Sequence, residues 1–364
     1  MTLEVDIRVS RGDFSLSVKS ELEGSGILGV YGPSGSGKTS LLRSIAGLEK
    51  NVSGSIIFAG EHWLDTQAGV FVPAHRRAVG FVFQDARLFP FTDVAGNLDF
   101  ADSRSRDAHS SITRERVIEA LDLSPLLHRG VAGLSGGERQ RVAMGRVLLS
   151  RPAVLLMDEP LSALDQQRKT QLLPYISRLA GEFGLPVVYV SHQLDELAAI
   201  ANTLLVLDAG DVIAQDSIST VLQRLDISVF DRHNAAVSVF DGEVLVQNHR
   251  LKTTMLGMGE QRLTVPQVQA EVGARLRLQF AAKDIALAMA MPESISIRNR
   301  FPGHVMEVQE DSESAYADVL VDIGAGVLRA RITREALQSL GIEPQCSIIA
   351  LVKSVSIEEA LPLA

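Results

Sequence analysis

The first half of the chain alternates short apolar runs with segments of helical periodicity. The pattern predicts strands over Ile27–Tyr31, Val79–Phe83, Val154–Met157 and Val187–Val190. It predicts one helix over 38–48, where apolar residues recur every three or four positions, and another over 166–182, ended by Gly184 and Pro186. Strands that alternate with helices in this way favour a mainly parallel sheet.

Beyond about Arg232 the pattern changes to short alternating runs with frequent turns, which predicts a β-rich part. Val272–Leu287 can be laid over Ile342–Ile357 at an offset of 70 residues, with Lys283 on Lys353. Two similar β units would explain the match. The alternative is chance, because period-two patterns align easily. A length of 364 residues also exceeds what one hydrophobic core usually serves. We expect three parts, over residues 1–232, 233–291 and 292–364.

Composition excludes several classes of protein. The net charge of −9 argues against a broad electrostatic grip on nucleic acid, so no nucleic-acid partner is expected. The single cysteine, Cys346, excludes an intrachain disulfide and cysteine-rich metal sites, fits a reducing cytosol, and is expected to be a small buried hydrophobe. No run approaches the twenty or so apolar residues of a spanning helix. At a membrane, the chain would therefore be recruited by a partner.

A glycine-rich loop lies between the first predicted strand and helix, and it satisfies the pattern GxxxxGK[ST]. Glycines let backbone N–H groups curl around phosphate oxygens, and the following helix points its positive end at the same anion. Lys38 would reach the β and γ phosphates, and the Thr39 hydroxyl would ligate Mg²⁺. The predicted nucleotide-binding residues are Gly32, Pro33, Ser34, Gly35, Ser36, Gly37, Lys38, Thr39 and Ser40.

Polar side chains follow three further predicted strands. Asp158 and Glu159 end the strand 154–157, where they would hold the Mg²⁺ shell and orient or deprotonate the attacking water. Gln84 and His192 end two other strands. Because parallel strands bring their carboxyl ends to one edge, Lys38, Gln84, Glu159 and His192 should converge there. The alternative for a lone Gln or His is a surface or capping role.

Leu134-Ser-Gly-Gly-Glu138-Arg-Gln-Arg141 forms a second candidate anion site. Ser135 with Glu138 three places on predicts a capping box that starts a helix through about Leu149. Its amino-terminal end, with Gly136 and Gly137, is suited to an anion. A chain with two such helix ends must bind two anions or share its nucleotide with a copy of itself.

This octet strongly resembles the signature of ABC ATPases, and the resemblance covers about Leu3–Leu225. It implies an α/β P-loop NTPase cassette with a mainly parallel sheet and a helical signature subdomain. It also implies ATP and Mg²⁺ as cofactors, with Thr39, Gln84 and Asp158 at the metal, and Glu159, His192 and Gln84 as catalytic residues. Asp165 would form the D-loop. In a head-to-tail homodimer, the signature of one copy would close over the ATP of the other; its residues here are Leu134, Ser135, Gly136, Gly137 and Glu138. Phe14 either stacks on adenine, as an upstream aromatic residue does in the family, or packs in the core, which its alternation favours.

Two stretches bear on the cargo. His75–Pro90 resembles the Q-loop region of molybdate-importer ATPases, although many have a histidine where Phe91 stands here. Leu88, Phe89 and Phe91 either form a socket for the membrane subunit or pack inward. Ser294-Ile-Ser-Ile-Arg298-Asn299, followed by Pro302-Gly303, resembles the opening of an all-β Mop/OB-like domain that binds molybdate or tungstate, and Lys353-Ser354 resembles the second anion-contacting segment of that fold. This implies an oxyanion site at Ser296, Arg298, Lys353 and Ser354, with molybdate as a regulatory ligand; the alternative is a domain that only dimerises.

The resemblances together predict the ATPase of a molybdate importer. It would act at the cytoplasmic face of the inner membrane, with integral membrane permease subunits and, indirectly, a periplasmic molybdate-binding protein. The nearest alternative is an importer ATPase for sulfate, sugar, polyamine or iron. Less favoured alternatives are a non-transport ABC ATPase and an oxyanion storage or sensing protein.

Overall fold

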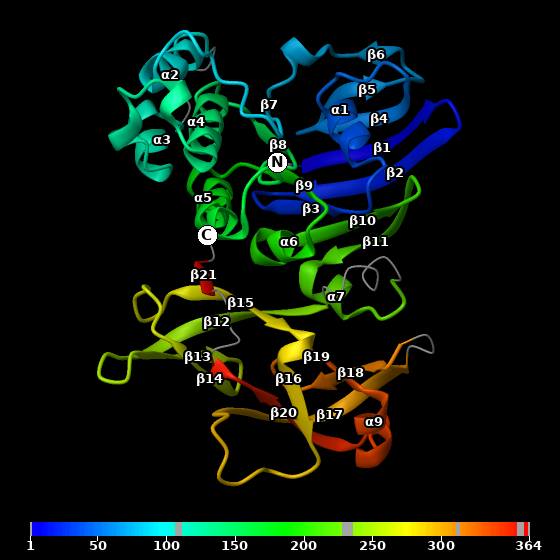
Figure 1. Ribbon diagram of the computed structural model, residues 1–364. Helices are drawn as coiled ribbons and strands as arrows, with labels where there is room; N and C mark the ends of the chain where they lie inside the picture. Colours follow the sequence, from blue (N-terminus) through cyan, green and yellow to red (C-terminus); the bar gives the residue numbers. More distant parts are fainter. Residues whose placement is uncertain (1, 106–110, 228–235, 311–313, 355–359, 363–364) are drawn as a thin grey trace. The chain divides into compact units, whose positions relative to one another are not determined.

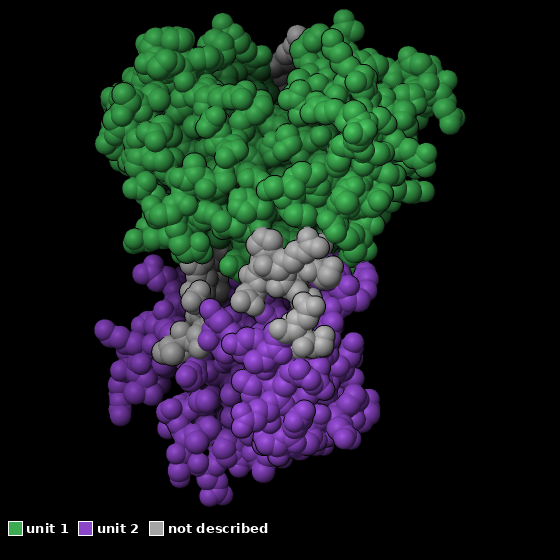
Figure 2. Space-filling view, turned by 45° about the vertical axis from the view of Figure 1, so that its right-hand side comes forward, with its two compact units in different colours: residues 1–216, 364 green, residues 217–363 purple. Residues whose placement is uncertain are grey.

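The computed structural model describes residues 2–105, 111–227, 236–310, 314–354 and 360–362 (Figure 1). The chain divides into two compact units, residues 1–216 and residues 217–363, which Figure 2 shows in different colours. Each unit is described by itself. The boundary predicted near residue 232 lies outside the described residues, and the division at residue 291 stays a prediction.

The first unit contains one eleven-stranded sheet in the order β6-β5-β4-β1-β2-β11-β10-β3-β9-β8-β7. Its strands are β1 (Thr2–Arg11), β2 (Phe14–Glu23), β3 (Ile27–Tyr31), β4 (Val52–Phe58), β5 (Glu61–Asp65), β6 (Val70–Phe71), β7 (Val79–Val82), β8 (Val154–Asp158), β9 (Val187–Ser191), β10 (Thr203–Asp208) and β11 (Asp211–Ser217). The run from β10 to β7 pairs in parallel, whereas β1 pairs antiparallel with β2 and β4. The predicted parallel sheet is therefore confirmed, with an antiparallel part added to it.

Burial explains where each kind of pairing occurs. All residues of β3 and β9 and the first four of β8 are buried, as expected for parallel strands that are covered on both faces. Strand β1 instead alternates buried and exposed positions, so only one of its faces packs in the core. The apolar runs in the sequence thus become the centre of the sheet.

The helices of the first unit are α1 (Lys38–Ile45), α2 (Val94–Asp102), α3 (Arg114–Ala120), α4 (Gly136–Leu148), α5 (Gln166–Phe183) and α6 (Leu194–Ile200). Helix α5 ends at Gly184, which is left-handed at φ 62°, as its position in the sequence predicts. The predicted limit of α1 at residue 48 is wrong. The helix ends three residues earlier because Gly47 adopts φ 72°, which turns the chain out of the helix. Helices α2, α3 and α4 lie together beside the sheet (Figure 1).

The second unit holds α7 (Ile218–Gln223), α9 (Arg334–Leu340) and two five-stranded sheets, with orders β14-β13-β12-β15-β21 and β16-β20-β17-β18-β19. The strands are β12 (Val237–Asn248), β13 (Thr253–Met258), β14 (Gln261–Pro266), β15 (Arg275–Ala281), β16 (Ile285–Ala288), β17 (Asn299–Glu310), β18 (Tyr316–Asp322), β19 (Val327–Thr333), β20 (Ser347–Val352) and β21 (Ala360–Pro362). The β-rich pattern is confirmed, although α9 was not predicted. Cys346 is half-buried, less than expected, and packs against the core of this unit.

The two sheets share one topology. In each, three consecutive antiparallel strands are followed by a fourth that pairs with the first of them. The fifth strand is exchanged: β16 follows β15 along the chain but pairs with β20, and β21 follows β20 but pairs with β15. The sequence repeat is therefore a structural repeat as well.

The predicted offset of the repeat is wrong by two residues. Gly273 donates its N–H to the Val244 carbonyl, and Gln345 donates to Val305 in the same way, which gives an offset of 345 − 273 = 72 residues. Lys353 thus corresponds to Ala281 and not to Lys283. A strand pattern of period two fits equally well when it is shifted by two, so hydrophobicity alone did not fix the offset. Residues 355–357 of the repeat lie outside the described residues.

A buried guanidinium holds the carboxyl-terminal end of α1. Arg77 is 5% exposed, and its Nη1 donates to the carbonyl oxygens of Ser44 (2.8 Å) and Ile45 (2.7 Å). Its Nε and Nη2 donate to the carbonyls of Val72 (2.8 Å) and Trp63 (3.1 Å). Burial lowers the pKa of Arg77 to about 10, so the group stays charged at neutral pH. Arg77 therefore ties the helix that follows the glycine-rich loop to the antiparallel part of the sheet.

We expect Arg77→Lys to lower the free energy of unfolding of the first unit by about 2 to 4 kcal/mol, because one ammonium cannot satisfy four separate carbonyls. The measurement is denaturant unfolding followed by the fluorescence of Trp63, the only tryptophan of the chain. Arg76→Lys, at the exposed neighbouring position, is the control and should change stability by less than about 0.5 kcal/mol. Equal stability of the two variants would contradict this account.

Candidate functional site

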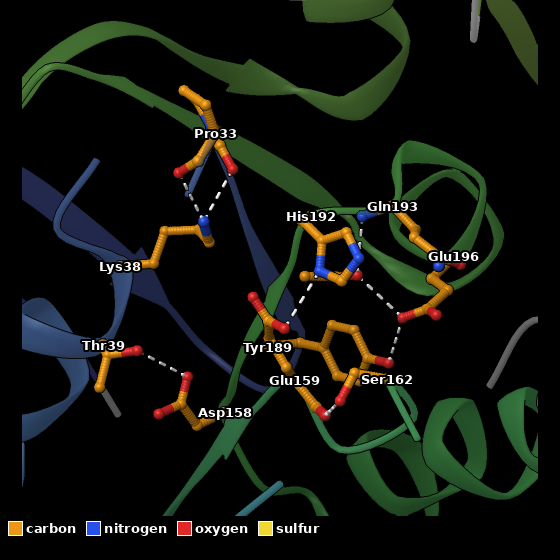
Figure 3. A network of polar contacts seen from close by, with 12 residues as sticks. Pro33, Lys38, Thr39, Asp158, Glu159, Ser162, Tyr189, His192, Gln193 and Glu196 are labelled. Carbon is orange, nitrogen blue, oxygen red and sulfur yellow. Dashed lines mark hydrogen bonds and ion pairs between the residues drawn. The ribbon is translucent and has the colours of Figure 1, made fainter. Parts of the chain in front are cut away.

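The glycine-rich loop between β3 and α1 encloses a lysine. Lys38 is 6% exposed, and its Nζ donates to the carbonyl oxygens of Gly32 (2.7 Å) and Pro33 (2.9 Å), as Figure 3 shows. Burial lowers the pKa of Lys38, and the negative charges of Glu159 and Asp158 act in the opposite direction. An ammonium is thus held inside the loop, beside two carboxylates.

Two positions of the loop accept only glycine, because a Cβ atom there would clash with its neighbours. Gly37 is left-handed at φ 101°, and a Cβ there would lie 2.7 Å from Leu16 Cδ1. A Cβ on Gly32 would lie 2.3 Å from the carbonyl oxygen of Leu207. Ser36 Oγ is buried and has no partner among the residues that the structure describes. These features fit a phosphate group, which such a loop binds through backbone N–H groups. The other predicted loop residues show no special packing: Ser34 and Gly35 are exposed, and Ser40 is half-buried.

The ends of β3, β8 and β9 meet at one edge of the sheet, because Asp158 pairs with Val190 and Tyr31 pairs with Ser191. Thr39 Oγ1 donates to Asp158 Oδ1 at 3.1 Å. Burial raises the pKa of Asp158, and the Thr39 hydrogen bond opposes that rise. A hydroxyl and a carboxylate at this distance are oxygen donors of the kind that Mg²⁺ prefers, so the residues fit the ion.

Glu159 and His192 point toward each other, with 3.1 Å between Glu159 Oε2 and His192 Nδ1 (Figure 3). Glu159 has φ 46°, a left-handed conformation that is uncommon outside glycine and asparagine. Its N–H donates to the Val190 carbonyl at 3.1 Å, and its own carbonyl accepts from Ser162 Oγ at 2.9 Å. The strained backbone is therefore held on both sides, which aims the carboxylate at the histidine.

Gln84 lies at the same edge, two residues beyond β7, whose Val82 pairs with Met157 of β8. Its side chain is exposed. The structure thus places Lys38, Thr39, Asp158, Glu159 and His192 at one edge of the sheet, with direct contacts between Thr39 and Asp158 and between Glu159 and His192. Gln84 lies just beyond the end of the neighbouring strand.

The capping box predicted at the signature segment is confirmed. Ser135 Oγ accepts from the Glu138 N–H at 3.3 Å, and Glu138 Oε2 accepts from the Ser135 N–H at 2.7 Å. These hydrogen bonds lower the pKa of Glu138, and the Arg129 guanidinium acts in the same direction.

The residues beside the cap are closely packed on one side. Leu134 is buried, and a Cβ on Gly136 would lie 2.8 Å from Leu164 Cδ2. An open cavity of about 290 Å³ lies beside this helix end and is lined by Ser135, Gly137 and Glu138, among others. Asp165 caps α5 by accepting from the Arg168 N–H at 3.0 Å.

The predicted oxyanion residues lie where β17 begins and β20 ends. Asn299 pairs with Val352, so Arg298 and Lys353 are the next residues beyond the last pair, and both are exposed. Ser354 is half-buried, and its Oγ accepts from Asn299 Nδ2 at 3.2 Å. Ser296 is exposed, two residues before Arg298. The structure therefore brings the two segments together at one end of the sheet.

Two known families match the chain: the ABC transporter family over residues 16–162 and the TOBE domain over residues 295–358. The molybdenum import ATP-binding protein ModC of Mesorhizobium japonicum is 39% identical over 99% of this chain and 97% of its own length. ModC 1 of Azotobacter vinelandii is 41% identical, covering 96% of this chain and 97% of its own. The chain belongs to the ATP-binding subunits of ABC transporters.

Solved structures agree with this family in fold. The cbiO1 protein of Clostridium perfringens, part of an ABC transporter complex, has a TM-score of 0.54 at 23% identity and covers 64% of this chain and 95% of its own. A nucleotide-free ATP-binding cassette from an ABC transporter gives 0.52 at 21% identity, covering 62% and 96%. The predicted ABC cassette is therefore confirmed, and the TOBE match together with the two antiparallel five-stranded sheets confirms the predicted all-β C-terminal fold class. Within the described ranges, no helix has both the length and the apolar character to cross a bilayer.

As an ABC-transporter ATPase, the chain uses ATP, generally with Mg²⁺, and cassettes of this family work as dimers with membrane permease partners.

Phe14 of this cassette is half-buried and packs against the core, with its Cζ 3.1 Å from where a Cβ on Gly37 would lie. Phe91 is 83% exposed, whereas Leu88 and Phe89 are half-buried. Of the two alternatives, inward packing therefore fits Leu88 and Phe89 in part, and contact with a partner is left mainly to Phe91.

Sequence reasoning missed the residue that holds this loop. Asn97 is fully buried; its Oδ1 accepts from the Phe89 N–H at 2.8 Å, and its Nδ2 donates to the Phe89 carbonyl at 3.1 Å. The Phe89 ring also lies 4.9 Å from the Arg146 guanidinium of α4. The available signal was a polar residue on the apolar face of α2, beside Val94, Leu98 and Ala101. The loop after Gln84 is therefore connected to the signature helix.

Glu138→Gln should destabilise the chain at neutral pH and have no effect in acid. The pKa of Glu138 in the folded chain lies below its ordinary value of 4.5, so the carboxylate stabilises the fold above that value and loses this contribution as the pH falls through the lowered pKa. The measurement is the thermal midpoint of chain and variant, without nucleotide, from pH 7 downward. Glu119→Gln, at an exposed position of α3, is the control and should leave the midpoint at pH 7 unchanged. A difference that widens on acidification contradicts the account.

Proposed function

We propose that this chain hydrolyses ATP to drive the import of molybdate through a separate membrane permease, at the cytoplasmic face of the inner membrane. The observation that carries the proposal is similarity at about 40% identity over nearly the whole length of relatives named for molybdenum import. The C-terminal TOBE match agrees with it. A periplasmic molybdate-binding protein would deliver the cargo, and the exposed Phe91 ring would contact the permease.

The loop and strand ends suggest how nucleotide is bound. Backbone N–H groups of the loop and the Lys38 ammonium would surround the phosphates, since Lys38 already lies within the loop. Thr39, Asp158 and Gln84 would supply oxygen ligands to the metal. Mg²⁺ at this position would neutralise phosphate charge.

Glu159 would polarise the attacking water, and His192 would hold the Glu159 carboxylate in place. The 3.1 Å contact and the constrained backbone of Glu159 support this division of roles. The Ser135 helix end of a second copy would cover the bound ATP, because α4 begins at Gly136 and leaves its first N–H groups unbonded within the helix. Asp165 would lie at the contact between the two copies.

Glu159→Gln should retain ATP binding and lose hydrolysis by about a hundredfold or more, because a neutral amide cannot take up the proton of water. With ATP bound and uncleaved, the variant should accumulate as a closed dimer. ATPase assays and light scattering measure the two effects. Glu182→Gln, at an exposed position of α5, is the matched control and should hydrolyse ATP normally. A Glu159 variant that turns over near the normal rate removes Glu159 from this role.

The cargo is tested with the chain reconstituted with its permease and binding protein in vesicles. Molybdate outside should stimulate ATP hydrolysis several-fold, and sulfate or a sugar should not. Stimulation by sulfate or a sugar, with none by molybdate, would overturn the cargo assignment while leaving the ATPase intact.

The same vesicles test molybdate as a regulatory ligand. We propose that Ser296, Arg298, Lys353 and Ser354 bind molybdate on the cytoplasmic side and hold the cassettes apart, because two exposed cations lie just beyond one strand pair and a hydroxyl adjoins them. Molybdate added on that side should lower transport, and Arg298→Ala with Lys353→Ala should abolish the inhibition. Unchanged inhibition in the double variant would exclude this site.

A further inference from the structure

A buried ion pair joins α5 to α6, close in sequence to His192. Lys169 of α5 and Glu196 of α6 are joined by a 2.9 Å contact between Nζ and Oε1, and their side chains are 4% and 5% exposed. Lys169 Nζ also donates to Gln193 Oε1 at 2.7 Å. Neither residue touches the candidate phosphate or metal ligands, so the proposed chemistry gives the pair no direct role.

The pair hydrogen-bonds to the residues on both sides of His192 in the sequence: Glu196 bonds Ser191, and Lys169 bonds Gln193. Glu196 Oε2 accepts from Tyr189 Oη and from Ser191 Oγ, each at 2.9 Å. Ser191 Oγ in turn accepts from the Gln193 N–H at 3.0 Å. Burial raises the pKa of Tyr189, which keeps its hydroxyl protonated as a donor. Figure 3 shows Glu196 connected to the segment that carries His192. The imidazole therefore sits on a segment that is fixed immediately before and after it.

The same pair is connected to Glu159 along the chain. The Lys169 N–H donates to the Asp165 carbonyl at 3.0 Å, in the first turn of α5. Ser162, between Asp165 and Glu159, bonds the Glu159 carbonyl. His192 contacts Glu159 directly, and Lys169 contacts Gln193, the next residue after His192. The chain from Glu159 to Lys169 and these two contacts together form a closed path that links Glu159, α5 and His192.

Stability is a weak explanation for a buried ion pair. Desolvating two charges costs several kcal/mol per ion, and apolar pairs of similar volume often serve as well. A polar network that is fully satisfied does fix geometry, because each member admits few orientations. We propose that Lys169 and Glu196 are positioning residues that set His192 against Glu159 and link this contact to the position of Asp165. The proposal rests on the roles proposed above for His192 and Glu159.

The test is a double-mutant cycle on ATP hydrolysis by the full-length chain, with single-turnover detection of slow rates. Lys169→Met keeps the length of the side chain and removes the charge. It should lower kcat by about tenfold and change KM for ATP by less than about twofold, because the phosphate ligands stay in place. Lys169→Arg should recover most of the lost rate. In a His192→Ala background, Lys169→Met should lower kcat by less than about twofold, because the group it positions is already gone.

Each outcome separates the two proposals. If His192→Ala alone hydrolyses ATP at the normal rate, the proposed role of His192 is wrong. If His192→Ala is slow and Lys169→Met lowers kcat by the same factor in both backgrounds, only the positioning proposal is overturned. Arg151→Met, which breaks the Arg151–Asp102 pair (2.8 Å) elsewhere in the unit, is the control for general destabilisation and should leave kcat unchanged.

A second variant keeps the test decisive if Lys169→Met fails to fold. Tyr189→Phe removes one hydroxyl that donates to Glu196 and preserves the packing of the ring. It should lower kcat by several-fold with KM unchanged, and have no further effect with His192→Ala. Normal kcat for Tyr189→Phe, or a loss of the same size with and without His192→Ala, would rule out positioning through this network.

Discussion

The site depends on the register of three buried parallel strands. Tyr31, Ser191 and Asp158 lie at the ends of β3, β9 and β8, and backbone hydrogen bonds fix the ends against each other. Because side chains alternate between the faces of a strand, a slip of one residue would turn Asp158 away from Thr39 and move His192 from Glu159. The strands are apolar on both faces, so the polar residues at their ends are what distinguishes one register from the next.

The Lys38 ammonium at this edge faces two carboxylates, Asp158 and Glu159, before any nucleotide arrives. Lys38 is buried in the loop, and Asp158 and Glu159 stabilise its charge against burial. Burial conversely raises the pKa of Asp158. An anionic ligand would meet the Lys38 ammonium and a divalent cation would meet the carboxylates, so this edge carries groups suited to both.

The sequence predicted the elements that local chemistry decides and failed where distant contacts decide. The central strands and the Ser135 cap follow from apolar runs and from a capping pair. The early end of α1 at Gly47 depends on Arg77, which occupies the space beside that glycine. Lys169 lies in the polar run 166–169 at the start of α5, and nothing in that run marks which residue will be buried. Packing against α6 makes that choice, so the ion pair with Glu196 was not predictable from periodicity.

The exchanged strands of the second unit explain how its two halves can differ in chemistry while keeping one fold. Each half completes its sheet with a strand from the other, so neither half forms its own sheet alone, and both must keep the backbone hydrogen bonds of the shared topology. Side chains at the strand ends are free of that constraint. At the positions of Arg298, Lys353 and Ser354, the other half carries Val237, Ala281 and Ala282, of which Val237 and Ala282 are buried and Ala281 is half-buried. The apolar side chains of the second set and the exposed cations of the first leave, within the described residues of the second unit, one candidate anion site rather than two.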